Sequence, residues 1–90
     1  PVVVVQGDSL NRSRIQTVVC VVLTSNLSWS GALGNLRLSA RSTGLPKDSV
    51  ANVSQIVTLD RQSLSEKAGR LSRRQIDLVI AGIELVVGRQ

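Results

Sequence analysis

Residues 49–59 read SVANVSQIVTL, and this stretch sets the fold class of the chain. Apolar and polar side chains alternate along much of it, and β-branched residues dominate, which is typical of a half-buried β-strand. The pattern predicts one bent strand, or two short ones, ending at Asp60.

Three further strands are expected before this stretch. Residues 2–5 are four consecutive valines, which favour a strand buried on both faces, with a turn directly after it. Residues 17–23 form a second valine-rich run. It should end at residues 24–26, because the hydroxyl and amide side chains there compete for backbone hydrogen bonds. Residues 35–39 alternate polar and apolar side chains and predict a half-exposed strand.

The remaining segments of the first half predict loops. Residues 11–14 carry two arginines among small polar residues. Residues 27–34 place Trp29 between serines and glycines, which indicates a mobile loop or an irregular edge. Residues 41–48 contain Gly44 and Pro46, both of which interrupt regular structure.

Two helices are expected to close the chain. The first covers residues 61–68 and ends at Gly69, with Asp60 as its N-cap and with Leu59 and Leu64 as a hydrophobic staple.

The second helix has the stronger local pattern. Ser72 and Gln75 predict a capping box, Leu71 and Ile76 a staple, and Gly88 a left-handed stop. One face collects the apolar side chains at spacings of three and four, and we expect it to pack on the sheet: Ile76, Val79, Ile80, Ile83 and Val87. A membrane-surface helix is the alternative, but the polar face has few Lys or Arg beyond the first turn.

A run of strands followed by terminal helices indicates an α+β fold, a small curved, mainly antiparallel β-barrel with a C-terminal helix. The 90 residues suffice for one domain, so we treat residues 1–90 as a single domain.

The net charge is +5, and nine of the eleven basic residues are arginine, which pairs with phosphate bidentately. Nucleic acid, an acidic protein segment and an anionic membrane surface all fit this charge, as does a basic surface without a partner. Trp29 is the only aromatic residue, which argues against an RNA site built on base stacking.

Several kinds of site are excluded by composition. With no histidine and one cysteine, the chain cannot assemble a zinc site, an internal disulfide or a histidine acid–base pair, so we expect no cofactor. Cys20 lies in an apolar run and should be a buried core residue. The lone thiol and the absence of a signal-peptide or membrane-spanning pattern favour a cytoplasmic protein without a membrane partner.

Polar side chains follow or interrupt the predicted strands. They could gather on one rim of a small barrel: Arg12, Thr24, Ser25, Asn26, Asn52, Ser54 and Gln55. Amides and hydroxyls can read the edges of unpaired bases, and arginine can hold phosphate. Taken singly, each of these residues is more often part of a turn than a ligand contact.

Five segments together resemble the MazF/PemK family, the mRNA interferases of type II toxin–antitoxin systems. In chain order they are residues 1–6 with Asn11 and Arg12, then 23–26, 45–50, 54–60 and 69–72. The resemblance runs nearly end to end, and it rests on the order and spacing of these segments rather than on any one of them.

The resemblance implies a curved β-barrel with a terminal helix, a homodimer, and metal-independent, sequence-specific cleavage of single-stranded RNA. It also implies neutralisation by an antitoxin with an acidic, flexible tail. Thr24 occupies the position of the family's catalytic threonine. By the same resemblance, RNA contacts are expected from a set of polar residues: Asn11, Arg12, Ser25, Asn26, Ser54 and Gln55.

The family places its catalytic arginine immediately before the proline that matches Pro1, and its first strand and loop lie upstream of that point. We therefore expect this family segment to be absent from residues 1–90, and cleavage to be impaired in a chain that starts at Pro1. The chain also departs from many relatives at Ser54 and Val57. A gyrase poison of the related CcdB type, and a truncated toxin that binds without cleaving, are the alternatives.

Overall fold

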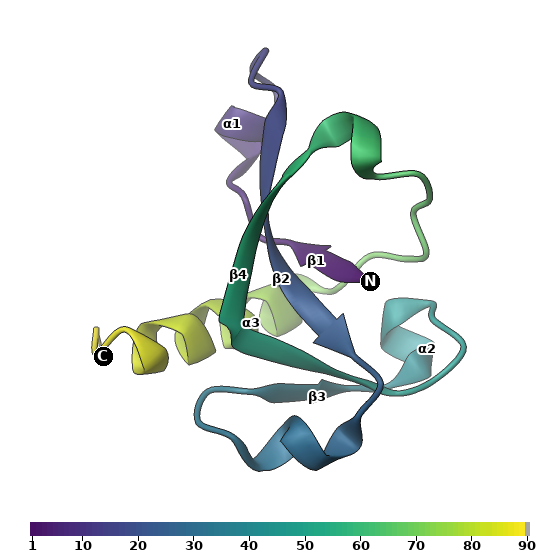
Figure 1. The fold of residues 1–90 in the computed structure, drawn as a ribbon, viewed down its shortest axis with the longest axis vertical. Coiled ribbons are helices and arrows are strands. Elements are labelled where there is room, and N and C mark those ends of the chain that lie inside the picture. Colours follow the sequence, from purple (N-terminus) through teal and green to yellow (C-terminus); the bar gives the residue numbers. More distant parts are fainter. Residues whose placement is uncertain (90) are drawn as a thin grey trace.

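The computed structural model describes residues 1–89 and shows a four-stranded antiparallel sheet curled into a half-barrel, with one long helix against it (Figure 1). The strand order is β1-β2-β4-β3, with bounds Val2–Val4, Thr17–Thr24, Ser49–Asp60 and Leu36–Leu38 respectively. The helix α3 spans Arg73–Val86. The predicted α+β class, with a curved antiparallel sheet and a C-terminal helix, is confirmed.

Strand β4 is one bent strand, the first of the two forms that its sequence allowed. Its two halves pair with β2 in different registers: Val22 lies opposite Asn52, whereas Val21 lies opposite Ile56. Residues 53–55 therefore have no partner on β2 and form a bulge. Such an insertion bends a strand and increases its twist, and the bend allows β4 to turn around the sheet beside α3 (Figure 1).

The core lies between α3 and one face of the sheet. Its buried side chains come from all four strands and from the helix: Val3, Val21, Leu23, Leu38, Ala51, Val53 and Val79. Cys20 is also fully buried, as predicted. Strand β1 is an edge strand, so the prediction that it is buried on both faces is wrong at Val4, which is 39% exposed.

Helix α3 begins and ends as its sequence predicts. The Ser72 hydroxyl accepts from the Gln75 backbone, the Gln75 side chain accepts from the Ser72 backbone, and Gly88 has φ +76°. Its packed face is shorter than expected, because Val87 is exposed. The last turn of the helix runs past β4, so no strand lies beneath it (Figure 1).

The helix predicted for residues 61–68 is wrong. Only a single 3-10 turn forms, η2 at Arg61–Ser63, the Asp60 side chain makes no capping bond, and residues 64–72 have no regular structure. So short a helix is marginal in water unless it buries an apolar face, and this segment offers only Leu64 and Ala68. It instead brings the backbone of Gly69 against that of Thr43 and Gly44.

Three short helical turns lie where loops were expected: α1 at Asp8–Asn11, η1 at Leu27–Gly31 and α2 at Ala40–Thr43. Side-chain caps explain two of them. Asn26 accepts from the Ser28 backbone at the start of η1, and Ser39 accepts from the Ser42 backbone at the start of α2. Turn residues in a sequence can thus cap a helical turn as well as end a strand.

Candidate active site

Thr24 is the last residue of β2, and two cross-strand pairs fix its neighbours. It lies opposite Val50 on β4, and Val50 in turn lies opposite Arg37 on β3. Paired residues on antiparallel strands project from the same face of the sheet. The adjacent positions Leu23 and Ala51 belong to the core under α3, so Thr24 and Arg37 project from the opposite face. We call this surface the Thr24 face.

Asn52 extends the Thr24 face along β4. It stands two residues beyond Val50, which makes it a diagonal neighbour of both Thr24 and Arg37, at Cα distances of about 7–8 Å. Its side chain is held by two others from the bulge. The Asn52 amide donates to Gln55 Oε1 at 3.0 Å, and the Ser54 hydroxyl donates to Asn52 Oδ1 at 3.0 Å.

The bulge explains why Ser54 and Gln55 are available on this surface. Neither has a partner on β2, and both side chains are exposed. The cluster of two amides and one hydroxyl presents donors and acceptors together, which is the chemistry that reads the edges of unpaired bases. Asn52, Ser54 and Gln55 of the predicted polar set therefore lie together at this end of the sheet, whereas Arg12 of the same set does not.

Ser25 and Asn26 follow Thr24 directly and belong to the same surface. The Asn26 backbone N–H donates to Thr24 Oγ1 at 3.1 Å, which orients the threonine side chain. Asn26 Oδ1 accepts from the backbone N–H and the hydroxyl of Ser28. Its Nδ2 group has no acceptor among residues 1–89, so its two hydrogens can serve an RNA acceptor.

The η1 turn that follows is tied to the bulge. Asn35 donates to the Trp29 carbonyl at 2.9 Å and accepts from the backbone N–H of Val53 at 3.1 Å. Trp29 is half exposed on this turn. The segment after Thr24 and the bulge of β4 are therefore parts of one hydrogen-bonded structure.

Arg37 is the residue of this face that the sequence pattern did not single out. Its guanidinium Nη2 lies 3.1 Å from Asp48 Oδ2, the only ion pair among residues 1–89. The other Asp48 oxygen accepts from the Ala40 backbone at 2.8 Å. This backbone hydrogen bond is the main reason that the pKa of Asp48 lies below its ordinary value, and the hydrogen bond from Arg37 is the next largest reason. The only sequence feature that could have drawn attention to Arg37 is its polar side chain between two leucines of an edge strand. This pattern usually indicates no more than a solvent-facing residue.

The structure does not bring Asn11 and Arg12 to the Thr24 face. They end α1, which lies beside the start of β2, about 24 Å from Thr24 if β2 is fully extended (Figure 1). Asn11 is engaged in a local network there. Gln6 donates to Asn11 Oδ1 and Asn11 donates to the Gln6 carbonyl, each at 3.1 Å, and Gln6 Oε1 accepts from the Val19 backbone.

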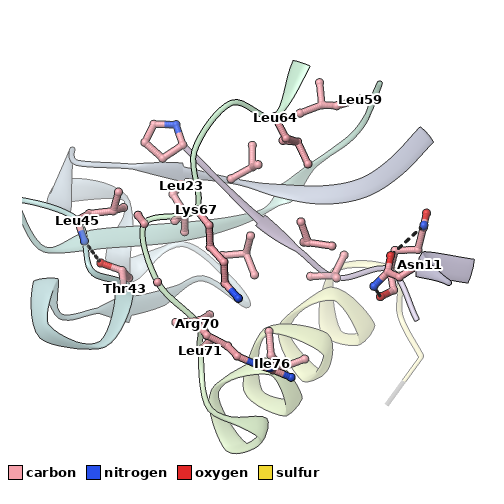
Figure 2. Close-up of a pocket in the computed structure, with 18 of the residues that line it drawn as sticks. Asn11, Leu23, Thr43, Leu45, Leu59, Leu64, Lys67, Arg70, Leu71 and Ile76 are labelled. Atoms are coloured by element: carbon pink, nitrogen blue, oxygen red, sulfur yellow. Dashed lines mark hydrogen bonds between the residues drawn. The ribbon is translucent and has the colours of Figure 1, made fainter. Parts of the chain in front are cut away.

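Asn11 instead lines a wide groove of about 1190 Å³, which Figure 2 shows. One wall is β1, another is α3, and residues 63–71 close the third side. Leucine side chains make up much of its labelled lining, with Lys67 and Arg70 from the irregular segment (Figure 2).

Pro1 connects β1 to the Thr24 end of the sheet. The Leu23 backbone N–H donates to the Pro1 carbonyl at 2.9 Å. Pro1 and Ser25 also line one small pocket of about 230 Å³. The position that precedes Pro1 in a longer chain would thus lie close to Thr24.

Metal-binding and membrane-spanning features do not add to this site. Residues 1–89 hold no group of three or more histidine, cysteine or carboxylate side chains placed to bind a metal ion. Each helix in this part of the chain is too short or too polar to cross a bilayer.

Comparisons with known proteins identify the family of the chain. The pattern of the family described as PemK-like, MazF-like toxin of type II toxin-antitoxin system matches residues 1–87. The chain is 40% identical over 87 residues to Endoribonuclease MazF6 of Mycobacterium tuberculosis, covering 97% of this chain and 76% of the relative. It is 28% identical over 85 residues to Endoribonuclease EndoA of Bacillus subtilis, covering 94% and 72%.

The fold also matches a solved structure, that of Mycobacterium tuberculosis toxin MazF-mt6. The TM-score is 0.86 at 18% sequence identity, with 100% of this chain and 87% of the other chain covered. By sequence and by architecture, the chain belongs to the PemK-like, MazF-like toxin family of type II toxin–antitoxin systems.

Proposed function

We propose that this chain is an endoribonuclease toxin, an mRNA interferase that cleaves single-stranded RNA at a short sequence without a metal ion. The observation that carries the proposal is the Thr24 face, where a threonine at a strand end stands within diagonal reach of the Asn52 cluster. Family membership and the relatives named as endoribonucleases supply the reaction class.

The proposed reaction is a transesterification. The 2′-hydroxyl of the RNA attacks the adjacent phosphorus and passes its proton to a solvent water. The bond from phosphorus to the 5′-oxygen breaks, and this oxygen takes up a proton from solvent. The products carry a 2′,3′-cyclic phosphate and a 5′-hydroxyl. Because RNA supplies the nucleophile, the protein has only to position the phosphate and stabilise its developing charge.

Thr24 would donate its hydroxyl hydrogen to a non-bridging phosphate oxygen. A neutral threonine is too weak a base to deprotonate the 2′-hydroxyl, so hydrogen-bond donation is the role that its chemistry supports. The Asn26 backbone already donates to Thr24 Oγ1, which leaves the threonine hydrogen free for the phosphate. The same bond fixes the direction of the hydroxyl before RNA arrives.

The resemblance pairs this threonine with an arginine placed just before the position of Pro1. The hydrogen bond from Leu23 to Pro1 and the pocket that Pro1 shares with Ser25 support this arrangement, because a residue attached to Pro1 would enter the site beside Thr24. Lacking that charge-stabilising group, residues 1–90 should cleave RNA roughly 10²–10³ times more slowly than a form that carries it.

RNA sequence would be read by the amide and hydroxyl groups around Thr24. Asn26 offers a free Nδ2 group, and the Ser54 and Gln55 side chains are exposed on the bulge. Ser25 borders the small pocket next to Pro1. Asn11 and Arg12 lie at the far end of β2, so they would contact RNA only at a distance from the scissile phosphate.

The antitoxin and the assembly are also part of the proposal. The net charge of +5 suits a partner with an acidic, flexible tail, because complementary charge speeds association. We also propose a homodimer and a cytoplasmic location, on the resemblance to the family alone.

The test is to incubate the purified protein with a synthetic RNA, with and without EDTA, and to identify the product ends by mass spectrometry. Two forms are compared: residues 1–90, and the same chain extended at Pro1 by the upstream segment of a relative. Cleavage by the extended form that EDTA does not affect, leaving cyclic phosphate and 5′-hydroxyl ends, is expected.

Two other results would redirect the assignment. Trapped gyrase–DNA cleavage complexes without RNA cleavage would indicate a gyrase poison of the CcdB type. RNA binding without cleavage by either form would indicate a toxin that only binds.

A further inference from the structure

Arg37 and Thr24 flank Val50 in one row across three strands, and both project from the Thr24 face. Two strand spacings separate their Cα atoms, a distance of about 10 Å. Val50 between them is fully buried, and the row places a hydroxyl on one side of it and a guanidinium on the other.

The Arg37 guanidinium is exposed and held by a single carboxylate. The Arg37 side chain is 56% exposed, and its partner Asp48 lies at 3.1 Å. Such exposed ion pairs contribute little to stability, so another anion can take the place of the carboxylate. Asp48 is anchored independently by the Ala40 backbone at 2.8 Å and would keep its position after Arg37 leaves.

We propose that Arg37 binds an RNA phosphate next to the one that Thr24 contacts, exchanging Asp48 for the phosphate as RNA binds. This inference rests on the proposed endoribonuclease function and adds an RNA-binding residue to it. Arginine presents a planar fork of N–H donors that can bind two phosphate oxygens at once.

The neighbours of Arg37 favour RNA over an acidic protein segment. On one side stand the Thr24 hydroxyl and the Asn52 amide, which suit phosphate and base edges. On the other side stands Asp48, which would repel glutamate and phosphate alike, but a run of glutamates offers no base edge for the Asn52 amide to bind.

The experiment compares Arg37→Gln with Arg74→Gln. Arg74 lies in the first turn of α3, on the opposite side of the sheet, and its exposed side chain has no hydrogen bond or ion pair within residues 1–89. Both variants lose one positive charge, so general attraction for RNA falls equally. Binding of a fluorescein-labelled RNA with a 2′-deoxy group at the cleaved nucleotide is measured by anisotropy over a range of salt concentrations.

Arg37→Gln should weaken binding about 10-fold, since a charge-assisted phosphate contact is lost, while Arg74→Gln changes it less than about 2-fold. The slope of log Kd against log salt should fall by about 0.7 for Arg37→Gln, the value for one phosphate on a single strand. In cleavage assays KM should rise while kcat changes little, because the contact is present before and during the reaction. Arg37→Lys should restore the salt slope but only part of the affinity.

Asp48→Asn provides a second test that removes no RNA contact. Its side-chain oxygen can still accept from the Ala40 backbone, so α2 should be preserved. Freed from its partner, Arg37 should make Asp48→Asn bind the same RNA about 3-fold more tightly than Asp77→Asn, which removes one exposed negative charge from α3. Weaker binding by Asp48→Asn would contradict the exchange.

Equal effects of Arg37→Gln and Arg74→Gln would overturn the inference. So would a result in which Arg37→Gln leaves RNA binding intact but weakens binding of a ten-residue polyglutamate peptide, which would assign Arg37 to an acidic protein partner. If the extended, unsubstituted protein neither binds nor cleaves RNA, the proposed function fails, and the role of Arg37 fails with it.

Discussion

The carbonyl oxygen of Gly34 occupies the space where a Cβ atom on Gly82 would stand, so the loop before β3 and helix α3 meet backbone to backbone. A Cβ on Gly34 would in turn meet the Gly82 carbonyl, and Gly34 has φ +79°. This contact lets the helix approach the sheet closely enough to bury Val79 in the same core cluster as Val53.

Gly82→Ala should therefore lower the free energy of unfolding by about 1–3 kcal/mol, because backbone atoms rather than a flexible side chain must move. Urea denaturation followed by circular dichroism measures the change. Gly31→Ala is the matched control, since no heavy atom of a residue distant in the sequence lies within 4 Å of the place that its added methyl group would take. Equal stability of the two variants would contradict the close contact.

The capping box at the start of α3 supports a second prediction. Ser72→Ala removes the acceptor of the Gln75 backbone N–H and should cost about 1 kcal/mol of stability. Ser72→Asp keeps an acceptor at this position and should cost clearly less. If alanine and aspartate behave alike in thermal denaturation, the cap contributes nothing.

Thr24→Ala should reduce kcat of the form that carries the upstream arginine by about 10²–10³ with little change in KM, because a donor to the developing charge is lost. Thr24→Ser retains the hydroxyl and should keep most of the activity. Thr58→Ala serves as control, because Thr58 is exposed on the other half of β4 and lies opposite Val19. Loss of activity in the control to the same degree would mean that Thr24 has no special role.

The lowered pKa of Asp48 gives a pH dependence. Its interactions should contribute fully at neutral pH and decline as the pH falls below about 3.9, the ordinary aspartate value. They should be absent below the lowered pKa of the folded state. Urea midpoints of the protein and of Asp48→Asn should therefore differ most at pH 7 and converge at the acid end. A difference that stays constant with pH would contradict the assignment.

Cys20 should resist thiol reagents in the folded protein. The side chain is fully buried, so a reagent cannot easily reach the sulfur. Burial also raises the pKa of the thiol, which lowers the fraction present as the reactive thiolate. Labelling by a chromogenic disulfide reagent should be slow in buffer and rapid in urea. Ser30→Cys in a Cys20→Ala background adds an exposed thiol for comparison and should react at once. Comparable rates for the two thiols in buffer would indicate that β2 opens readily.

Features that depend on residues close together in the sequence were predictable from it. The capping box of Ser72 and Gln75 and the β-branched run of β2 each involve residues a few positions apart. The single bent strand β4 was one of two predicted forms, and the choice between them depends on its pairing with β2. No local pattern specifies that pairing.

The predicted helix at residues 61–68 failed for a related reason. A plausible cap at Asp60 was present, but the segment has too few apolar residues to offset the cost of helix nucleation. Its path is instead fixed by the contact of Gly69 with Thr43 and Gly44, which are 25 or more positions away in the sequence.

The residues of the candidate site also fall into those that the sequence predicted and those that only strand pairing reveals. Thr24, Asn26, Ser54 and Gln55 were singled out, and the structure places them at one end of the sheet. Arg37 was not, because its place in one row with Thr24 and Val50 arises only from two successive strand pairings.

Trp29 gives the molecule a single intrinsic optical reporter. No other residue of the 90 is aromatic, so near-ultraviolet emission comes entirely from one half-exposed indole on η1. That turn begins three positions after Thr24 and is bonded through Asn35 to the bulge of β4. Without any label, emission wavelength and quenching would therefore follow events at the Thr24 end of the sheet, separately from those at α1 or the far end of β2.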